Sequence, residues 1–145
     1  MVEAFGAGSV GLGTGASSNI DVATGFTPNI IRVRRSGDYS NLSAAITNDF
    51  YIDFYLDGKA STNIELESFV FDSDKDRGDV ALFATEGTYS SAPNAADVLG
   101  TIDSNTSSGT ISLSGITLAD AGVSFRMYFY DGATFNSEDR TFSSN

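Results

Sequence analysis

The sequence predicts an all-β protein, an antiparallel β-sandwich of jelly-roll type, and three observations support this class. Short segments with apolar residues at every second position recur along the 145 residues. Turn dipeptides such as Ser108-Gly109 and Ser114-Gly115 separate several of them. Helical turns are expected only at residues 42–46 and 117–122, because no segment keeps a 3.6-residue period for longer. Short strands at this spacing are typical of sandwiches and jelly rolls.

The clearest strand is VSFRMYFY, residues 123–130. Its odd-numbered positions are all apolar, whereas its even-numbered positions carry Ser124, Arg126, Tyr128 and Tyr130. Alternation over this length predicts an antiparallel strand with one face in the core. We therefore expect the arginine and the tyrosines on an outer face, toward a ligand, another subunit or water.

Further strands are expected at residues 30–35, 50–56, 63–71, 80–84, 98–103 and 109–116. In the second of these segments the apolar residues alternate with Tyr51, Asp53 and Tyr55, which we place on the opposite face of the strand.

The segment NIELESFVF, residues 63–71, predicts a strand with a defined inner face. We expect Ile64, Leu66 and Val70 to point inward, because they alternate with polar residues over most of the segment.

The composition restricts the chemistry that the chain can perform. With no Cys and no His, it cannot supply a Ser-His-Asp or Cys-His nucleophile or a conventional zinc site. A net charge of −11 argues against binding to nucleic acid or to an anionic membrane surface, and no apolar run is long enough to span a membrane. Catalysis by two carboxylates stays open, although short strands leave little room for a deep cleft.

The N-terminal part differs in composition from the rest. Residues 1–25 are rich in Gly, Ala and Ser, and we separate them from a single β-sandwich domain of residues 26–145. Phe5, Val10 and Leu12 could anchor this segment in an extended form. The glycines between them would let it run close to a neighbouring backbone.

Several strand patterns resemble a known family. The residues that carry the resemblance are Phe50, Tyr51, Phe54, Leu66, Ser68, Phe71, Leu113, Ser114, Gly115, Phe125, Arg126, Tyr128 and Tyr130. On these residues, the chain resembles the secreted bacterial β-sandwich domains that often precede a PEP-CTERM sorting signal. The resemblance implies a secreted or cell-surface domain that is not an enzyme and has no catalytic residues. No anchor motif follows here, and we expect that any signal peptide has been removed.

The family pattern also suggests how the chain could assemble. In that family a further strand follows the arginine-bearing strand, whereas here only DRTF, residues 139–142, remains. A sandwich without its last strand has an open edge that can pair with another chain. If residues 5–13 of one copy completed the sheet of the next, the contact would be heterologous and the product a filament. Alternatively, residues 5–13 form the first strand of their own domain.

One segment has the spacing of a calcium-binding loop. Asp72, Asp74 and Asp76 follow the Asp-x-Asp-x-Asp pattern that wraps oxygen ligands around Ca²⁺, and Asp79 could join them. The pattern is not an EF-hand, because the glycine and the glutamate that an EF-hand requires are missing. We expect either a looser structural calcium site or a solvated loop between strands.

A second candidate site is a glycan-binding strand face. Its residues would be Arg126, Tyr128, Tyr130, Tyr51 and Tyr55, because tyrosine rings stack on sugars and a guanidinium binds hydroxyls. The alternative is a cross-strand stack of arginine and tyrosine in which Arg126 pairs with Asp53.

The sequence thus favours a non-enzymatic extracellular structural subunit that self-assembles into a filament or surface layer through its N-terminal segment. The main alternative is a monomeric carbohydrate-binding module. An enzyme with a carboxylate pair is the weakest of the three hypotheses.

Overall fold

The computed structural model describes residues 10–13, 20–23, 30–33, 39–58, 60–61, 63–72, 79–103, 108–130 and 140–143. Every strand pair in these ranges is antiparallel. Their helical content is one short α-helix and one 3-10 turn. The prediction of an all-β protein is confirmed, and each segment predicted as a strand contains one.

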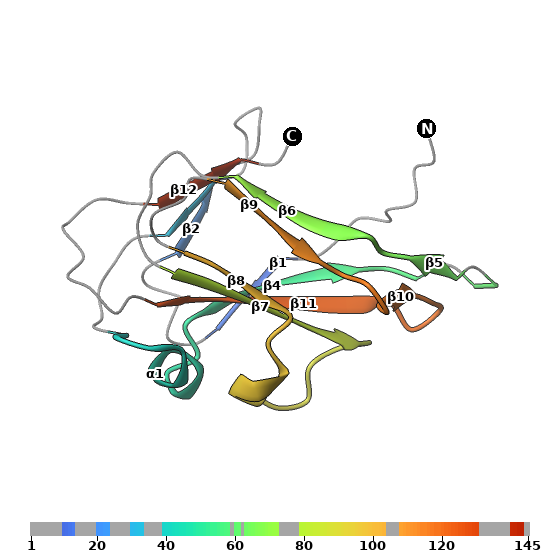
Figure 1. Cartoon of the computed structure of the whole chain (residues 1–145), viewed down its shortest axis with the longest axis horizontal. Coiled ribbons are helices and arrows are strands. Elements are labelled where there is room, and N and C mark those ends of the chain that lie inside the picture. The colour runs from blue at the N-terminus through green and yellow to red at the C-terminus, as the bar shows by residue number, and fades with distance from the viewer. Residues whose placement is uncertain are drawn as a thin grey trace.

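A five-stranded sheet forms the centre of the molecule (Figure 1). In spatial order it consists of β1 (Val10–Leu12), β4 (Tyr51–Leu56), β11 (Val123–Tyr130), β7 (Asp79–Glu86) and β8 (Gly100–Ile102). The strand β11 lies in the middle and pairs with β7 along its whole length. The N-terminal strand β1 forms one edge of this sheet.

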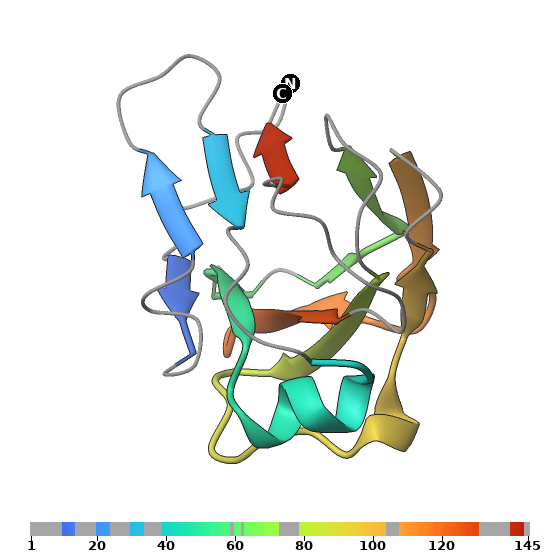
Figure 2. The ribbon, with the colours of Figure 1, turned by 90° about the vertical axis from the view of Figure 1, so that its left-hand side faces the viewer.

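The other strands form three smaller groups. These are β12 (Arg140–Ser143) with β3 (Ile30–Val33) and β2 (Ile20–Ala23), β6 (Ser68–Asp72) with β9 (Ser108–Ser112), and β10 (Thr117–Leu118) with β5 (Ile64–Glu65). Figures 1 and 2 show the first two groups over the same face of the five-stranded sheet.

The opposite face of the sheet is covered by α1 (Leu42–Thr47) and η1 (Ala95–Asp97), as Figure 2 shows. The predicted helical turn at residues 42–46 is therefore confirmed. Asn41 caps α1 by accepting a hydrogen bond from the Ala44 backbone N–H, which would otherwise have no partner in the helix. Ala45 of α1 is fully buried. We call this side of the five-stranded sheet, with Arg126 and Tyr128 on it, the helix face.

The strand β11 is buried on both faces, so the prediction of a half-buried strand is wrong. Residues 123–129 are all buried, including Arg126 and Tyr128 on the helix face. The cause is tertiary: a central strand has neighbours on both sides, and α1, η1 and the segment before η1 cover the face that was expected to be outer.

The inner face predicted for residues 63–71 is also partly wrong. Val70 is 69% exposed and Ile64 is 37% exposed, although both were expected to point inward. Leu66 packs against the core as expected, and Phe69 does so as well. The segment does not form one strand, because β5 ends at Glu65 and β6 begins at Ser68. This interruption shifts the alternation, which moves Val70 to the outer face.

The expected helical turn at residues 117–122 is absent. Thr117 and Leu118 form β10, which pairs with Glu65 and Ile64 of β5. The chain then turns at Gly122, whose N–H donates to the Ala119 carbonyl and whose φ is +73°.

Of the two turn dipeptides, Ser114-Gly115 forms a turn and Ser108-Gly109 does not. Gly115 has a φ of +86°, which favours glycine. Gly109 lies inside β9, where a Cβ atom would come within 2.9 Å of the Ile102 side chain. A larger residue there would have to displace the Ile102 side chain, because β9 packs closely on β8.

Candidate functional site

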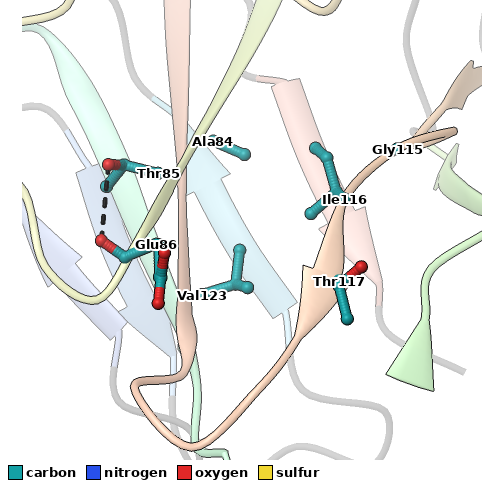
Figure 3. A pocket seen from close by; sticks show the side chains of 7 residues that line it. All are labelled: Ala84, Thr85, Glu86, Gly115, Ile116, Thr117 and Val123. Atoms are coloured by element: carbon teal, nitrogen blue, oxygen red, sulfur yellow. Dashed lines mark hydrogen bonds between the residues drawn. The ribbon is translucent and has the colours of Figure 1, made fainter. Parts of the chain in front are cut away.

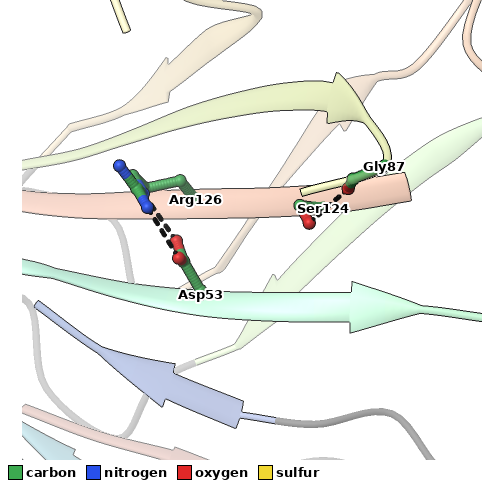
Figure 4. Close-up of polar contacts among 4 residues, drawn as sticks. All are labelled: Asp53, Gly87, Ser124 and Arg126. Carbon is green, nitrogen blue, oxygen red and sulfur yellow. Dashed lines mark hydrogen bonds and ion pairs between the residues drawn. The ribbon is translucent and has the colours of Figure 1, made fainter. Parts of the chain in front are cut away.

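The helix face is organised around an ion pair between Arg126 of β11 and Asp53 of β4 (Figure 4). The two residues are directly opposite each other in the strand register. Arg126 Nε donates to Asp53 Oδ1 at 2.7 Å, and Nη2 donates to Oδ2 at 2.8 Å. The Arg126 side chain is 8% exposed and that of Asp53 27%. Two parallel hydrogen bonds fix the orientation of both groups.

Two tyrosine rings enclose the guanidinium of Arg126. Its Cζ atom lies 3.7 Å from the ring centroid of Tyr51 and 4.2 Å from that of Tyr89. Both contacts are cation–π interactions of short range. The Tyr128 ring meets the Tyr51 ring edge-on at 5.3 Å and the Phe83 ring edge-on at 5.7 Å. The aromatic groups therefore leave the arginine almost no contact with solvent.

Burial and the ion pair shift the proton affinities of these groups. Burial alone would lower the pKa of Arg126, but its hydrogen bonds with Asp53 and the negative charge of Asp53 raise that pKa above its usual value. Burial raises the pKa of Tyr51, Tyr89 and Tyr128. The nearby Arg126 charge partly opposes the rise, and at Tyr128 a hydrogen-bond contact with Arg126 opposes it more than the charge does. The guanidinium therefore stays charged and the three phenols stay neutral near neutral pH.

The segment 87–99, between β7 and β8, is fixed onto this face. The Ser124 hydroxyl donates to the Gly87 carbonyl at 2.6 Å (Figure 4), and the Gly87 N–H donates to the Gly122 carbonyl at 2.9 Å. At the C-terminal end of this segment, the Leu99 N–H donates to the Leu82 carbonyl at 2.9 Å. Between these anchors, Tyr89 lies against Arg126.

The five residues of the predicted glycan-binding face do not form an open platform. Arg126 and Tyr128 are buried, and Tyr51, Tyr55 and Tyr130 are half-buried. The Tyr55 hydroxyl is used within the chain, since it donates to the Ala121 carbonyl at 2.9 Å. The alternative prediction, a cross-strand stack in which Arg126 pairs with Asp53, is confirmed.

Sequence reasoning missed Tyr89 and Ser124 as members of this cluster. Tyr89 lies in a polar segment without periodicity, so no pattern in the sequence brings it near residue 126. Ser124 shares the alternation of Arg126, but its partner, the Gly87 carbonyl, is a backbone group that no sequence pattern marks.

The candidate N-terminal strand lies at the edge of the five-stranded sheet. Val10, Gly11 and Leu12 of β1 oppose Phe54, Asp53 and Ile52 of β4. The next residue, Gly13, is buried, and its N–H donates to the Tyr51 carbonyl at 3.1 Å. A Cβ atom on Gly13 would lie 1.9 Å from the Asp49 carbonyl oxygen, so only glycine fits. Phe5 and the side chains of Val10 and Leu12 lie outside the described residues.

Most of the candidate calcium loop lies outside the described residues. Asp72 ends β6 and Asp79 begins β7, but Asp74 and Asp76 are not described. Among the residues that the structure describes, no group of three or more acidic, histidine or cysteine side chains could hold a metal ion. Calcium binding by this loop stays a prediction.

A shallow pocket lies between the C-terminal end of β7, the first residue of β11 and the turn before β10 (Figure 3). Its volume is about 290 Å³, at the small end of the range for ligand sites. It is lined by Ala84, Thr85, Glu86, Gly115, Ile116, Thr117 and Val123. None of these is a residue that the sequence marked as a candidate, and the lining offers a single carboxylate and two hydroxyls.

Comparison with protein-family models, curated proteins and solved structures found no match for this chain. In the described part of the chain, no helix has the length and apolar character needed to cross a membrane.

Proposed function

We propose that this chain is a non-enzymatic extracellular structural subunit whose copies form a filament or surface layer by exchanging the N-terminal strand. In this proposal each copy is a jelly-roll β-sandwich whose five-stranded sheet is completed by β1 of a neighbouring copy. The observation that carries the proposal is the position of β1. It is a short edge strand at the start of the chain, and three residue pairs join it to β4.

Strand exchange needs no new interface. The pairs of β1 with β4 would be the same whether β1 comes from the same copy or from another, so high protein concentration can favour the exchanged form. The sequence that follows Gly13 is TGASSN, residues 14–19, a composition typical of flexible connections. In the proposed assembly each copy gives its strand to one neighbour and receives a strand from a different neighbour, so the contact is heterologous and the copies grow into a fibre.

The geometry gives less support to the alternative of a carbohydrate-binding module. Arg126 already binds Asp53 with two hydrogen bonds, and the Tyr51 and Tyr89 rings lie close against its guanidinium. A sugar would have to displace part of the cluster to reach the guanidinium. The proposed extracellular location rests on the resemblance to secreted bacterial β-sandwich domains.

Cysteine cross-linking tests the exchange directly, because the natural chain has no cysteine. Val10 and Phe54 are opposite each other in the β1–β4 register, at a separation that suits a disulfide. We would refold together one variant with Val10→Cys and a second variant with Phe54→Cys, and then oxidise the mixture. Exchange predicts a disulfide between the two different variants, identified by mass spectrometry of the joined peptides.

A matched control replaces the second variant by Val70→Cys. Val70 is exposed on β6 and pairs with Thr110 of β9, away from the β1–β4 pair. The exchange proposal predicts no specific product with this control. If the Val10→Cys and Phe54→Cys mixture also gives no mixed disulfide at concentrations where the protein assembles, β1 stays in its own copy and the proposal is wrong.

A further inference from the structure

We propose that the helix face binds one buried water molecule, held by the hydroxyls of Tyr89 and Tyr128 beside the guanidinium of Arg126. This water ties the segment 87–99 to the five-stranded sheet. The site lies next to the β1–β4 edge, since Asp53 opposes Gly11, but the inference holds whether β1 comes from the same copy or from another and so does not depend on the proposed function.

The first observation is a pair of buried hydroxyls. The Tyr128 side chain is fully buried, and its hydroxyl has no hydrogen-bond partner within the described part of the chain. The hydroxyl of Tyr89 is also buried and lacks a partner there. A buried hydroxyl without a partner costs about fivefold or more in the folding equilibrium constant. Two such groups in one cluster favour a bound partner such as an ordered water.

The second observation is that both tyrosines lie close to the same cation. The Tyr89 ring lies 4.2 Å from Arg126 Cζ, and the Tyr128 ring packs edge-on against Tyr51, whose ring contacts the same guanidinium. Arg126 approaches the Tyr128 hydroxyl closely enough to lower its pKa, first as a hydrogen-bond donor and then through its charge, although the contact lacks good hydrogen-bond geometry. Asp53 uses Nε and Nη2, so the guanidinium keeps N–H donors for a further acceptor.

Water fits this site better than an ion or a sugar. The Arg126–Asp53 pair is neutral as a whole, so a bound anion would leave an uncompensated charge in a buried place. Tyr128 is fully buried, so a ligand larger than water would have to displace neighbouring side chains to reach its hydroxyl. A water molecule can accept from the guanidinium and exchange hydrogen bonds with both phenols, which gives it the usual two to four partners.

A crystal structure at about 1.5 Å resolution tests the site. We expect one ordered solvent peak about 2.6–3.2 Å from both hydroxyl oxygens. A direct hydrogen bond between Tyr89 and Tyr128, or from Arg126 to Tyr128, with no such peak would overturn the proposal. A peak that shows anomalous scattering after growth in bromide would identify an anion and would also overturn it.

Tyrosine-to-phenylalanine variants give an independent measure in solution. Tyr89→Phe and Tyr128→Phe should each raise the unfolding equilibrium constant about fivefold. The double variant should lose less free energy of unfolding than the sum of the losses in the two single variants, because both hydroxyls bind the same water. Amide hydrogen exchange in the segment 87–99 should become faster in all three variants.

Tyr39→Phe is the control, since Tyr39 is partly exposed and stacks on Phe50 at 4.7 Å outside this cluster. It should leave both the unfolding constant and the exchange of residues 87–99 unchanged. If Tyr128→Phe stabilises the protein or leaves it unchanged, its hydroxyl binds nothing in the folded state and the water site is wrong. Fully additive effects would likewise contradict a shared water.

Discussion

A single charged residue, Arg126, determines how the helix face is built. An arginine in the central strand of a sheet must have its charge compensated, because a buried and unpaired cation is very costly. Asp53 on the neighbouring strand supplies the charge, and two tyrosine rings pack against the guanidinium. These contacts hold Arg126 within the sheet, with two tyrosine rings against its guanidinium and two of its nitrogen atoms hydrogen-bonded.

Asp53→Asn should be strongly destabilising. The substitution leaves the buried guanidinium without its counter-charge, and we expect the free energy of unfolding to fall by about 3 kcal/mol. Asp57→Asn is the matched control, since Asp57 follows the same strand but is exposed, and it should change stability by less than about 0.5 kcal/mol. Urea denaturation of both variants measures the difference. Equal losses of stability in the two variants would show that the Arg126–Asp53 ion pair does not stabilise the fold.

The buried tyrosines should make the protein sensitive to alkaline pH. The pKa of Tyr51, Tyr89 and Tyr128 is raised above the usual 10.0 in the folded chain, mainly by burial. Above about pH 10 the unfolded chain therefore loses protons that the folded chain keeps, and the free energy of unfolding falls as pH rises. Their contribution to stability is fully present below pH 10.

Denaturation in urea from pH 8 to pH 11 checks this prediction. Tyr89→Phe should reduce the slope at high pH, because it removes one of the groups whose protons are released on unfolding. A free energy of unfolding that stays constant, or that rises, between pH 10 and pH 11 would contradict the assignment of raised pKa values.

At the scale of the elements, the contact between β6 and the central sheet depends on which residues point inward. Phe69 of β6 lies 6.1 Å from Phe125 of β11 and 6.5 Å from Phe54 of β4, measured between ring centroids. Val70, its neighbour, points outward and is 69% exposed. These two adjacent residues therefore test the register of the whole strand.

Phe69→Ala should lower the free energy of unfolding by about 3 kcal/mol, because it removes an aromatic side chain from a packed cluster. Val70→Ala on the same strand should change it by no more than about 0.5 kcal/mol. Thermal unfolding of the two variants gives the comparison. A larger loss for Val70→Ala than for Phe69→Ala would mean that β6 has the register first expected from the sequence.

The docking of β1 should depend on Gly13. Gly13→Ala places a Cβ atom against the Asp49 carbonyl, and we expect a loss of about 2 kcal/mol together with faster amide exchange in residues 10–12. Deleting residues 1–13 should give a similar loss of stability, because both changes remove β1 from the sheet. If Gly13→Ala leaves exchange in β1 unchanged, the strand does not dock in this way.

The sequence predicts strands better than it predicts what covers them. The alternation in β11 and β4 identifies both strands and places Arg126 and Asp53 on matching faces, so their pairing could be foreseen. The elements that cover that face could not be foreseen, because α1, η1 and the segment around Tyr89 are distant in sequence from Arg126. The register predicted for β6 is wrong for another reason. Two residues separate β5 from β6, and nothing in the hydrophobic pattern of the sequence indicates this break.

At the scale of the whole molecule, the proposed assembly connects the fold with a biological role. The described part of the chain places β1 at a sheet edge, where it can be replaced without disturbing the central strand β11. The net charge of −11 would keep free subunits apart at low concentration, and its repulsion is screened by salt. Assembly should therefore be favoured by high protein concentration and by moderate ionic strength.

Negative-stain electron microscopy of the isolated protein at high concentration tests the central claim most directly. We expect regular fibres from the natural chain and dispersed particles from a variant that lacks residues 1–15, provided that the variant still folds by circular dichroism. Dispersed single particles from the natural chain, at every salt and protein concentration tested, would contradict assembly by strand exchange and would place β1 in its own copy.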